Sequence, residues 1–67
     1  MTRAEQKENA TRLLLEIDKC ETEDDLDKVD ERAEIMMQIG HITKKAYRAI
    51  EEALDDRIMD LVEQGKL

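Results

Sequence analysis

The sequence predicts an all-α fold, a small three-helix bundle with short turns. In three segments, apolar residues recur at steps of three and four, which is the spacing of one face of an amphipathic helix. The chain contains no proline, so nothing of that kind interrupts a helix. Helix-capping residues mark the two short turns between the segments. Because 67 residues form one domain at most, we expect a single helical domain over residues 1–67.

The first expected helix runs from about Arg3 to Cys20. Thr2 and Glu5 have the spacing of a capping box, in which each side chain accepts a hydrogen bond from the backbone N–H of the other residue. Leu15 falls nearly opposite the apolar face, and it is either an ordinary exposed leucine or part of a contact surface. The apolar face consists of Ala10, Leu13, Leu14, Ile17 and Cys20.

The second expected helix runs from about Glu23 to Ile39. Thr22 is a good N-cap because its side-chain oxygen can accept from a free backbone N–H of the first turn. Asp25 has the position of the capping-box partner, and with Glu23 and Asp24 it places negative charge at the positive end of the helix dipole. The residues expected to point inward are Leu26, Val29, Ala33, Met36 and Met37, whereas Ile35 and Ile39 project from the other side.

The third expected helix runs from Lys44 to about Gln64, where Gly65 stops it. Gly40 is placed to end the second helix in a left-handed conformation. Thr43 is then the next N-cap, and Ile42 and Tyr47 have the spacing of a hydrophobic staple. The expected core of the whole bundle is Leu14, Ile17, Leu26, Val29, Ala33, Met36, Tyr47, Ile50, Leu54, Ile58 and Leu61.

One continuous helix from Glu23 to Gln64 is the rival architecture. Steps of three and four residues continue without a break across the proposed turn, as they do in a coiled coil. The seam of such a helix would contain Gly40, Thr43 and Arg57, however, and the capping signals around the turn would have no role. We therefore favour three separate helices.

The charge balance argues against direct binding to nucleic acid. Asp and Glu number 18 against 11 Lys and Arg, so the net charge is -7, whereas affinity for phosphate comes from cations. One tyrosine and no tryptophan or phenylalanine leave few stacking platforms for bases. The cluster of Lys44, Lys45 and Arg48 solvates the start of the third helix, pairs with acids of a neighbouring helix, or contacts phosphate. We expect no direct specific binding to nucleic acid.

The sequence offers little for catalysis. His41 is the only histidine, so a His-based triad has no second candidate, and a polar residue is expected at its turn position. Cys20 lies on an inward face, where a free cysteine behaves as a small hydrophobe, and the acids that follow it oppose a low thiol pKa. No metal-ligand spacing and no glycine-rich phosphate loop occurs. We expect no enzyme, no catalytic residues, no metal and no cofactor.

The location and assembly of the chain follow from its general properties. A single cysteine cannot form an internal disulfide, which fits a reducing compartment. No apolar run has the length of a membrane span, and the N-terminal residues lack the apolar core of a signal peptide. We therefore expect a cytoplasmic protein without membrane contact. Its small core makes either a monomer or a weak homodimer reasonable.

Two stretches resemble the Hha/YmoA family of small helical modulators of gene expression. They are I-D-K-C-E-T-E-D-D-L-D-K-V, which ends at Val29, and A-L-D-D-R-I-M-D-L over Ala53 to Leu61. In that family a Cys-x-Thr turn, a helix start with Leu and Val three apart, and an Ala-x-Asp-His-Arg-x-x-Glu-Leu segment recur in this order. The region of resemblance covers about Leu13 to Leu67. It implies a single Hha-like helical domain.

The resemblance also implies a partner and a binding surface. Bacterial members of the family bind the N-terminal dimerisation region of H-NS-type nucleoid proteins, and their acidic residues meet basic side chains there. Carried over to this chain, those acids fall on Asp24, Asp27 and Asp55. If the second and third helices pack antiparallel, the three carboxylates lie near one end of the bundle. We thus expect an adaptor that binds an H-NS-type or other DNA-associated protein and modulates its activity.

Three alternatives remain open at this point. Between Val29 and Arg57 the chain is longer than the bacterial members, a spacing similar to the Hha-like small companion of the recombination helicase in T-even phages. An accessory role in recombination is therefore one alternative. An acidic DNA mimic that inhibits a DNA-binding enzyme is the second. The third is a structural dimer or spacer with an outer seam of Leu15, Ile35, Ile39 and Met59.

Overall fold

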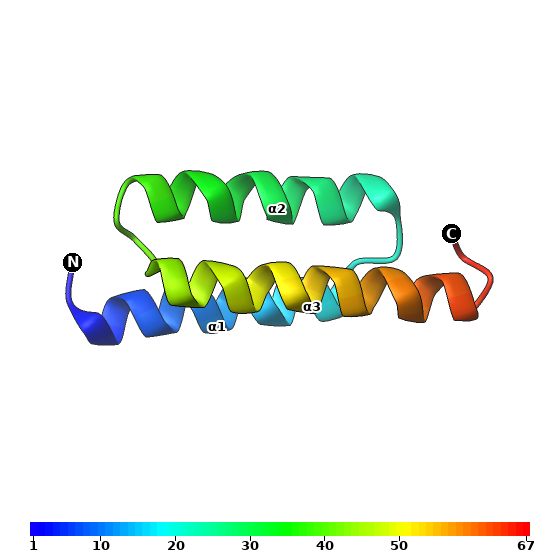
Figure 1. Cartoon of the computed structure of the whole chain (residues 1–67), viewed down its shortest axis with the longest axis horizontal. Coiled ribbons are helices and arrows are strands. Elements are labelled where there is room, and N and C mark those ends of the chain that lie inside the picture. The colour runs from blue at the N-terminus through cyan, green and yellow to red at the C-terminus, as the bar shows by residue number, and fades with distance from the viewer.

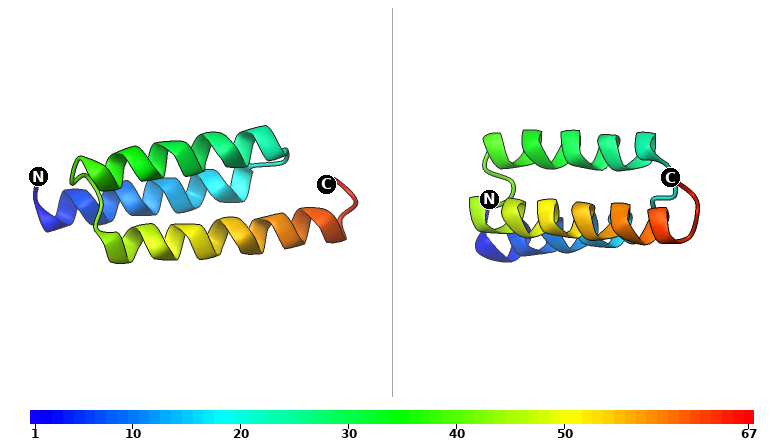
Figure 2. Two further views of the ribbon diagram at one scale, coloured as in Figure 1. Left: turned by 45° about the horizontal axis from the view of Figure 1, so that its top comes forward. Right: turned by 45° about the vertical axis from the view of Figure 1, so that its right-hand side comes forward.

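The protein is a bundle of three helices, in which consecutive helices are antiparallel, in a computed structural model that describes all 67 residues. The helices are α1 (Arg3–Lys19), α2 (Glu23–Gln38) and α3 (Lys44–Glu63), and each packs against the other two. The chain reverses at both turns, so that α1 and α3 are parallel and α2 is antiparallel to both (Figures 1 and 2). The body is 40 Å long and 16 Å across in both other directions. The predicted fold class is confirmed, and the continuous helix is wrong.

Each helix begins where the sequence predicts and ends one residue earlier than expected. Cys20, Ile39 and Gln64 are the residues that cap the C-terminal ends. At the N-terminal ends, Thr2, Thr22 and Thr43 all accept a hydrogen bond from the backbone N–H three residues later, at 3.0 to 3.2 Å. These side-chain bonds satisfy N–H groups that have no partner inside the helix.

The two expected capping boxes differ. Thr2 and Glu5 form the reciprocal pair of hydrogen bonds. At α2, the Asp25 carboxylate accepts instead from the backbone N–H of Glu21 at 3.4 Å, one residue before the N-cap. This bond and hydrogen bonding of the carboxylate with the Thr22 hydroxyl lower the pKa of Asp25. The reciprocal contact is therefore present but displaced by one residue.

The turn between α2 and α3 closes on Gly40, whose φ is +81°. The backbone N–H of His41 donates to the carbonyl of Met36 at 2.8 Å, and that of Gly40 donates to Met37 at 3.2 Å, which is the Schellman pattern. Two side chains of α1 support this turn, because Gln6 donates to the carbonyl of Gly40 at 2.9 Å and Asn9 donates to that of His41 at 3.0 Å.

The turn between α1 and α2, at the other end of the bundle, is supported by α3. Arg57 Nε donates to the carbonyl of Cys20 at 3.0 Å. Each turn is thus held by a side chain from the helix that it does not connect: α1 holds the turn between α2 and α3, and α3 holds the turn between α1 and α2.

The core corrects part of the predicted list. Leu14 and Ile58 are 37% and 39% exposed, whereas Leu13 and Ile42 are 2% exposed and were not in that list. Leu13 and Leu14 are neighbours about 100° apart on α1, so the positions of the two neighbouring helices decide which of them is covered. Ile58 is exposed because it lines an open groove between α2 and α3. The buried residues are Leu13, Ile17, Cys20, Leu26, Val29, Ala33, Ile42, Ile50, Leu54 and Leu61, with Met36 and Tyr47 packed against them.

Candidate protein-binding groove

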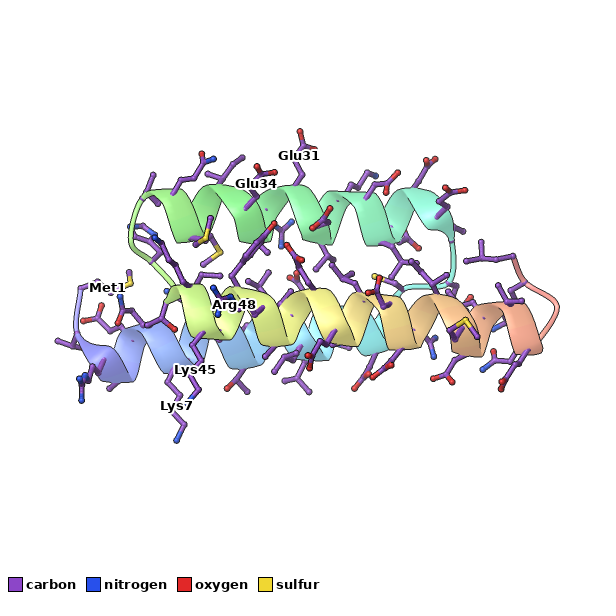
Figure 3. All side chains as sticks on the ribbon, viewed as in Figure 1. Met1, Lys7, Glu31, Glu34, Lys45 and Arg48 are labelled. Carbon is purple, nitrogen blue, oxygen red and sulfur yellow. The ribbon has the colours of Figure 1, made fainter.

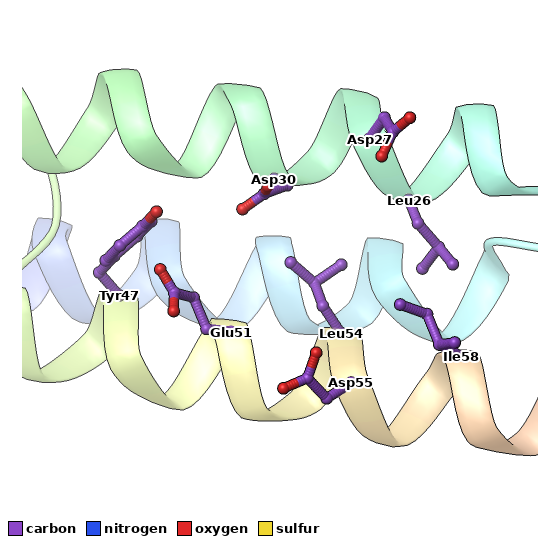
Figure 4. A pocket seen from close by; sticks show the side chains of 8 residues that line it. All are labelled: Leu26, Asp27, Asp30, Tyr47, Glu51, Leu54, Asp55 and Ile58. Atoms are coloured by element: carbon purple, nitrogen blue, oxygen red, sulfur yellow. The ribbon is translucent and has the colours of Figure 1, made fainter.

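A groove of about 260 Å³ runs between the antiparallel helices α2 and α3 (Figure 4). We call it the α2/α3 groove. Leu26 and Leu54 are buried at its floor, and Ile58 lies beside them. Its complete lining is Leu26, Asp27, Asp30, Tyr47, Glu51, Leu54, Asp55 and Ile58.

Four of the lining residues are acids, two from each helix. Asp27 directly follows buried Leu26, and Asp55 directly follows buried Leu54. Because successive residues are about 100° apart on a helix, an acid next to an inward leucine lies at the edge of the helix face. Asp30 and Glu51 reach the groove as the residues one turn away from Leu26 and Leu54. The result is an apolar floor between two acidic rims.

The structure brings together two of the three acids expected at the binding surface. Asp27, on α2, and Asp55, on α3, both line the α2/α3 groove, and Figure 4 shows them at different positions along it, with the Asp27 carboxylate directed away from α3. Asp24 lies one turn before Asp27, in the exposed first turn of α2, and is not part of the lining. The shared groove follows from the antiparallel packing of α2 and α3.

Two acids of the groove, Asp30 and Glu51, were missing from the predicted site. Both carry a signal that the sequence contains, since Asp30 is four residues after Leu26 and Glu51 is four residues after Tyr47. Residues at this spacing are neighbours on a helix surface. An acid one turn from each inward residue was therefore as good a candidate as the acid next to it.

Tyr47 closes one end of the groove, and its hydroxyl points toward α2 (Figure 4). Hydrogen bonding with the Glu51 carboxylate, burial and the charges of Glu51, Asp30 and Glu34 raise the pKa of Tyr47 to about 12. A hydrogen bond donated by the neutral phenol favours the protonated form, as do nearby negative charges. The hydroxyl is thus a hydrogen-bond donor and a poor base or nucleophile at neutral pH.

The four groove carboxylates have no cationic partner inside the chain. The three ion pairs of the protein join Arg12 to Glu8, Arg32 to Glu16 and Lys66 to Glu21, and none of them reaches the groove. Carboxylates that are close together and unpaired attract a cation. The apolar floor suits the methylene stem of a lysine or arginine, whose charged head would then meet the rims. The groove is therefore chemically suited to a basic side chain.

Other groups considered for chemistry lie apart from the groove. Cys20 is buried, and burial with the charges of Asp25 and Glu16 raises the pKa of its thiol, against an opposing effect of Arg57. His41 is in the turn between α2 and α3, at the other end of the bundle from Cys20. No group of three or more His, Cys, Asp or Glu side chains is arranged to hold a metal ion.

The basic cluster of Lys44, Lys45 and Arg48 is exposed at the start of α3. None of the three forms an ion pair with an acid of a neighbouring helix. Figure 3 shows Lys45 beside Lys7 of α1, with both side chains pointing away from α2. The parallel packing of α1 and α3 therefore extends this basic region onto a second helix.

Comparison with known proteins found no relative of the chain. No protein-family model matches the chain, and no curated protein or solved structure is significantly similar to it. None of the three helices combines the length and the apolar character that a membrane crossing requires.

Proposed function

We propose that the protein is a small acidic adaptor without enzymatic activity, which binds a nucleic-acid-associated protein and modulates its activity on DNA. The observation that carries this proposal is the α2/α3 groove, where four unpaired carboxylates flank an apolar floor. Such an arrangement suits a partly desolvated contact with a basic side chain of a partner protein. Contacts of this kind govern specificity and the rate of association.

Asp27 and Asp55 have the central role in this proposal. They line the groove from different helices, so a partner whose basic side chains reach both edges of the groove would be bound by both helices, and charge-assisted hydrogen bonds of this type are stronger than neutral ones. Asp30 and Glu51 extend the acidic rims along the groove toward Tyr47. Asp24, on the outer surface of α2, would contact the same partner only at the edge of the interface.

An H-NS-type nucleoid protein is the partner we propose first. Its dimerisation region is the partner implied by the resemblance of Ile17–Val29 and Ala53–Leu61 to the Hha/YmoA family. The net charge of -7 also favours this class, because an acidic chain would influence DNA through a DNA-bound protein and not through phosphate contacts. The adaptor would add negative charge to its partner.

A protein of a phage recombination complex is the second candidate partner. The spacing between Val29 and Arg57, which includes the turn at Gly40, favours this alternative because it resembles that of the phage companion protein. A basic recombination helicase would use the same α2/α3 groove. An acidic DNA mimic would instead depend on carboxylates over much of the surface, and the variants described next separate that possibility.

Binding to a purified H-NS-type dimerisation region, measured by calorimetry, tests the proposal. The double substitution Asp27→Asn and Asp55→Asn should weaken binding by about 2 to 5 kcal/mol, because it leaves the partner's cation without its counter-charge. Asp24→Asn should have a smaller effect. The helical content should remain unchanged, since both groove acids are exposed.

The matched control is Glu52→Gln with Glu63→Gln, which removes the same amount of charge from exposed positions outside the groove. This control should bind nearly as well as the natural protein. Equal weakening by the two double substitutions would show that only the net charge matters, and it would favour the DNA mimic. Absence of binding by the natural protein, with binding to a recombination helicase, would favour the phage alternative.

A further inference from the structure

The side of the bundle formed by α1 and α3 carries cations at one end. A cleft of about 780 Å³ between these helices is lined by Arg3, Lys7 and Lys45, together with uncharged residues such as Ala10 and Ala49. The three cations are exposed and take part in no ion pair of the chain. The fold therefore makes no use of their charge.

The same side carries carboxylates at its other end. Asp18 is eleven residues after Lys7 on α1, and Asp56 is eleven residues after Lys45 on α3. Eleven residues are about three helical turns, so each carboxylate lies on the same face of its helix as the lysine, about 16 Å farther along. Both aspartates are exposed and unpaired. Because α1 and α3 are parallel, the two helices carry their cations at one end and their carboxylates at the other.

Between the two charged ends, α1 carries an apolar group, whereas α3 carries the exposed Glu52 seven residues after Lys45 and four before Asp56. Leu14 is 37% exposed, and it follows Lys7 by seven residues and precedes Asp18 by four, which places it on the same face. Ala49 is exposed in the corresponding stretch of α3. We call this side, from Lys7 and Lys45 through Leu14 to Asp18 and Asp56, the α1/α3 face.

We propose that the α1/α3 face is the interface of an antiparallel homodimer. A twofold rotation that reverses the helix direction sets Lys7 of one copy opposite Asp18 of the other, and Lys45 opposite Asp56. Each pair occurs twice, because a twofold interface is isologous. Leu14 then lies close to the twofold axis and meets its own copy. The face is thus complementary to itself in charge at its two ends.

A second copy fits this face better than a different partner. A uniformly acidic surface would be attracted at Lys7 and Lys45 but repelled at Asp18 and Asp56, and a uniformly basic one would be repelled at the opposite end. Only a surface with the reversed order of charges matches both ends. The second copy has that order, although the net charge of -7 on each copy opposes association.

The dimer is weak, and it leaves the α2/α3 groove free. One side of a body 40 Å long and 16 Å wide offers less than the roughly 800 Å² that each partner buries in a specific interface of standard size. The acidic groove lies on the other side of α3, so both copies keep theirs accessible. The dimer is therefore independent of the proposed function and would make the adaptor bivalent.

Sedimentation equilibrium over a wide range of protein concentration tests the dimer. The apparent mass of the natural protein should rise from one chain toward two. Lys7→Glu places two carboxylates opposite each other and should weaken dimerisation by at least about tenfold. Adding Asp18→Lys restores opposite charges and should restore association. The matched control is Lys28→Glu on α2, an exposed lysine without an ion pair, which makes the same change in net charge and should have a much smaller effect.

Crosslinking provides a second readout that does not depend on charge. Leu14→Cys should form an interchain disulfide on mild oxidation, whereas Leu15→Cys, which is about 100° around α1 from Leu14 and 57% exposed, should form much less. The natural Cys20 is buried and should not contribute in the folded protein. A monomeric mass at every concentration, equal weakening by Lys7→Glu and Lys28→Glu, no rescue by Asp18→Lys, or equal crosslinking of the two cysteine variants would each overturn the proposal.

Discussion

Tyr47 is the only aromatic residue of the protein, and it reports on the acidic α2/α3 groove. Its pKa is raised to about 12 by the hydrogen bond with Glu51, by burial and by neighbouring acids, whereas an unperturbed tyrosine has a pKa of about 10. The folded state therefore holds the phenolic proton more tightly than the unfolded state. This contribution to stability is fully present below about pH 10 and is lost as the pH rises to about 12.

An alkaline titration followed by the ultraviolet absorbance of tyrosinate checks this prediction. The natural protein should ionise with a midpoint near pH 12. Glu51→Gln should lower the midpoint toward the ordinary value, because it removes the charge that opposes ionisation. Glu52→Gln, which changes an exposed acid outside the groove, should leave the midpoint unchanged. A midpoint near pH 10 in the natural protein would mean that Tyr47 does not contact Glu51.

Leu13 and Leu14 show where a residue-level prediction from sequence reaches its limit. Both fit the apolar spacing of α1, and the expected core contained Leu14. The structure buries Leu13 and leaves Leu14 more than a third exposed. Periodicity gives the centre of an apolar face, but the edges depend on where the neighbouring helices lie. The same reason explains the omission of Asp30 and Glu51 from the predicted site, since the register of α2 against α3 decides which acids share a groove.

Alanine substitution of the two leucines should give unequal losses of stability. Leu13→Ala should lower the free energy of unfolding by about 2 to 5 kcal/mol, the usual cost for a buried leucine. Leu14→Ala should cost less than about 1 kcal/mol, because surface changes usually have small effects. Urea denaturation at a protein concentration that keeps the chain monomeric measures both. Equal losses would place the two side chains in equivalent surroundings.

At the scale of the helices, the capping residues predicted the structure well. Thr2, Thr22 and Thr43 begin the three helices, and Gly40 ends α2. These signals act locally, through hydrogen bonds between residues close in sequence, so they can be recognised without knowing the fold. The contacts of Gln6, Asn9 and Arg57 with the turns could not be predicted in this way, since they join residues that are more than thirty positions apart.

Gly40 and Gly65 permit a comparison of two turns with similar backbones. Their φ angles are +81° and +75°, and no atom would clash with an added Cβ at either site. Gly40→Ala should therefore cost about 1 to 2 kcal/mol from the left-handed conformation alone. Gly65→Ala should cost clearly less, because no side chain of another helix donates to the backbone of its turn, whereas Gln6 donates to the Gly40 carbonyl, so the turn at Gly65 can open locally.

Thermal or urea unfolding of both glycine variants checks this expectation. Both variants should keep the helical content of the natural protein. A loss at Gly65 as large as that at Gly40 would mean that the last turn of α3 is as firmly held as the turn between α2 and α3. No loss at Gly40 would mean that this turn does not require a positive φ.

At the scale of the whole molecule, charge is distributed unevenly over the three sides of the bundle. The side between α2 and α3 carries the acidic groove, whereas the α1/α3 face carries cations at one end and the exposed Asp18 and Asp56 at the other. The sequence shows the net excess of acid and the cluster of Lys44, Lys45 and Arg48. It does not show that Lys7 joins this cluster, because that requires the parallel arrangement of α1 and α3.

The isolated protein should not bind duplex DNA specifically at physiological salt. Its net charge of -7 opposes contact with phosphate, and its few clustered cations can neutralise only a few phosphates. A gel-shift experiment with protein free of other DNA-binding proteins measures this. A submicromolar affinity would show that the basic end of the α1/α3 face binds nucleic acid directly, and it would remove the need for a partner protein.

The most direct test of the proposed function is a nuclear magnetic resonance titration of the natural protein with an H-NS-type dimerisation region. If the α2/α3 groove is the binding surface, the largest changes in amide shift should fall within Leu26–Asp30 and Tyr47–Ile58, and they should include Tyr47 itself. Residues of the α1/α3 face, such as Lys7 and Leu14, should change little at a protein concentration that keeps the chain monomeric. Changes centred on Lys7 and Lys45, with the groove unaffected, would contradict the assignment of the groove as the binding site.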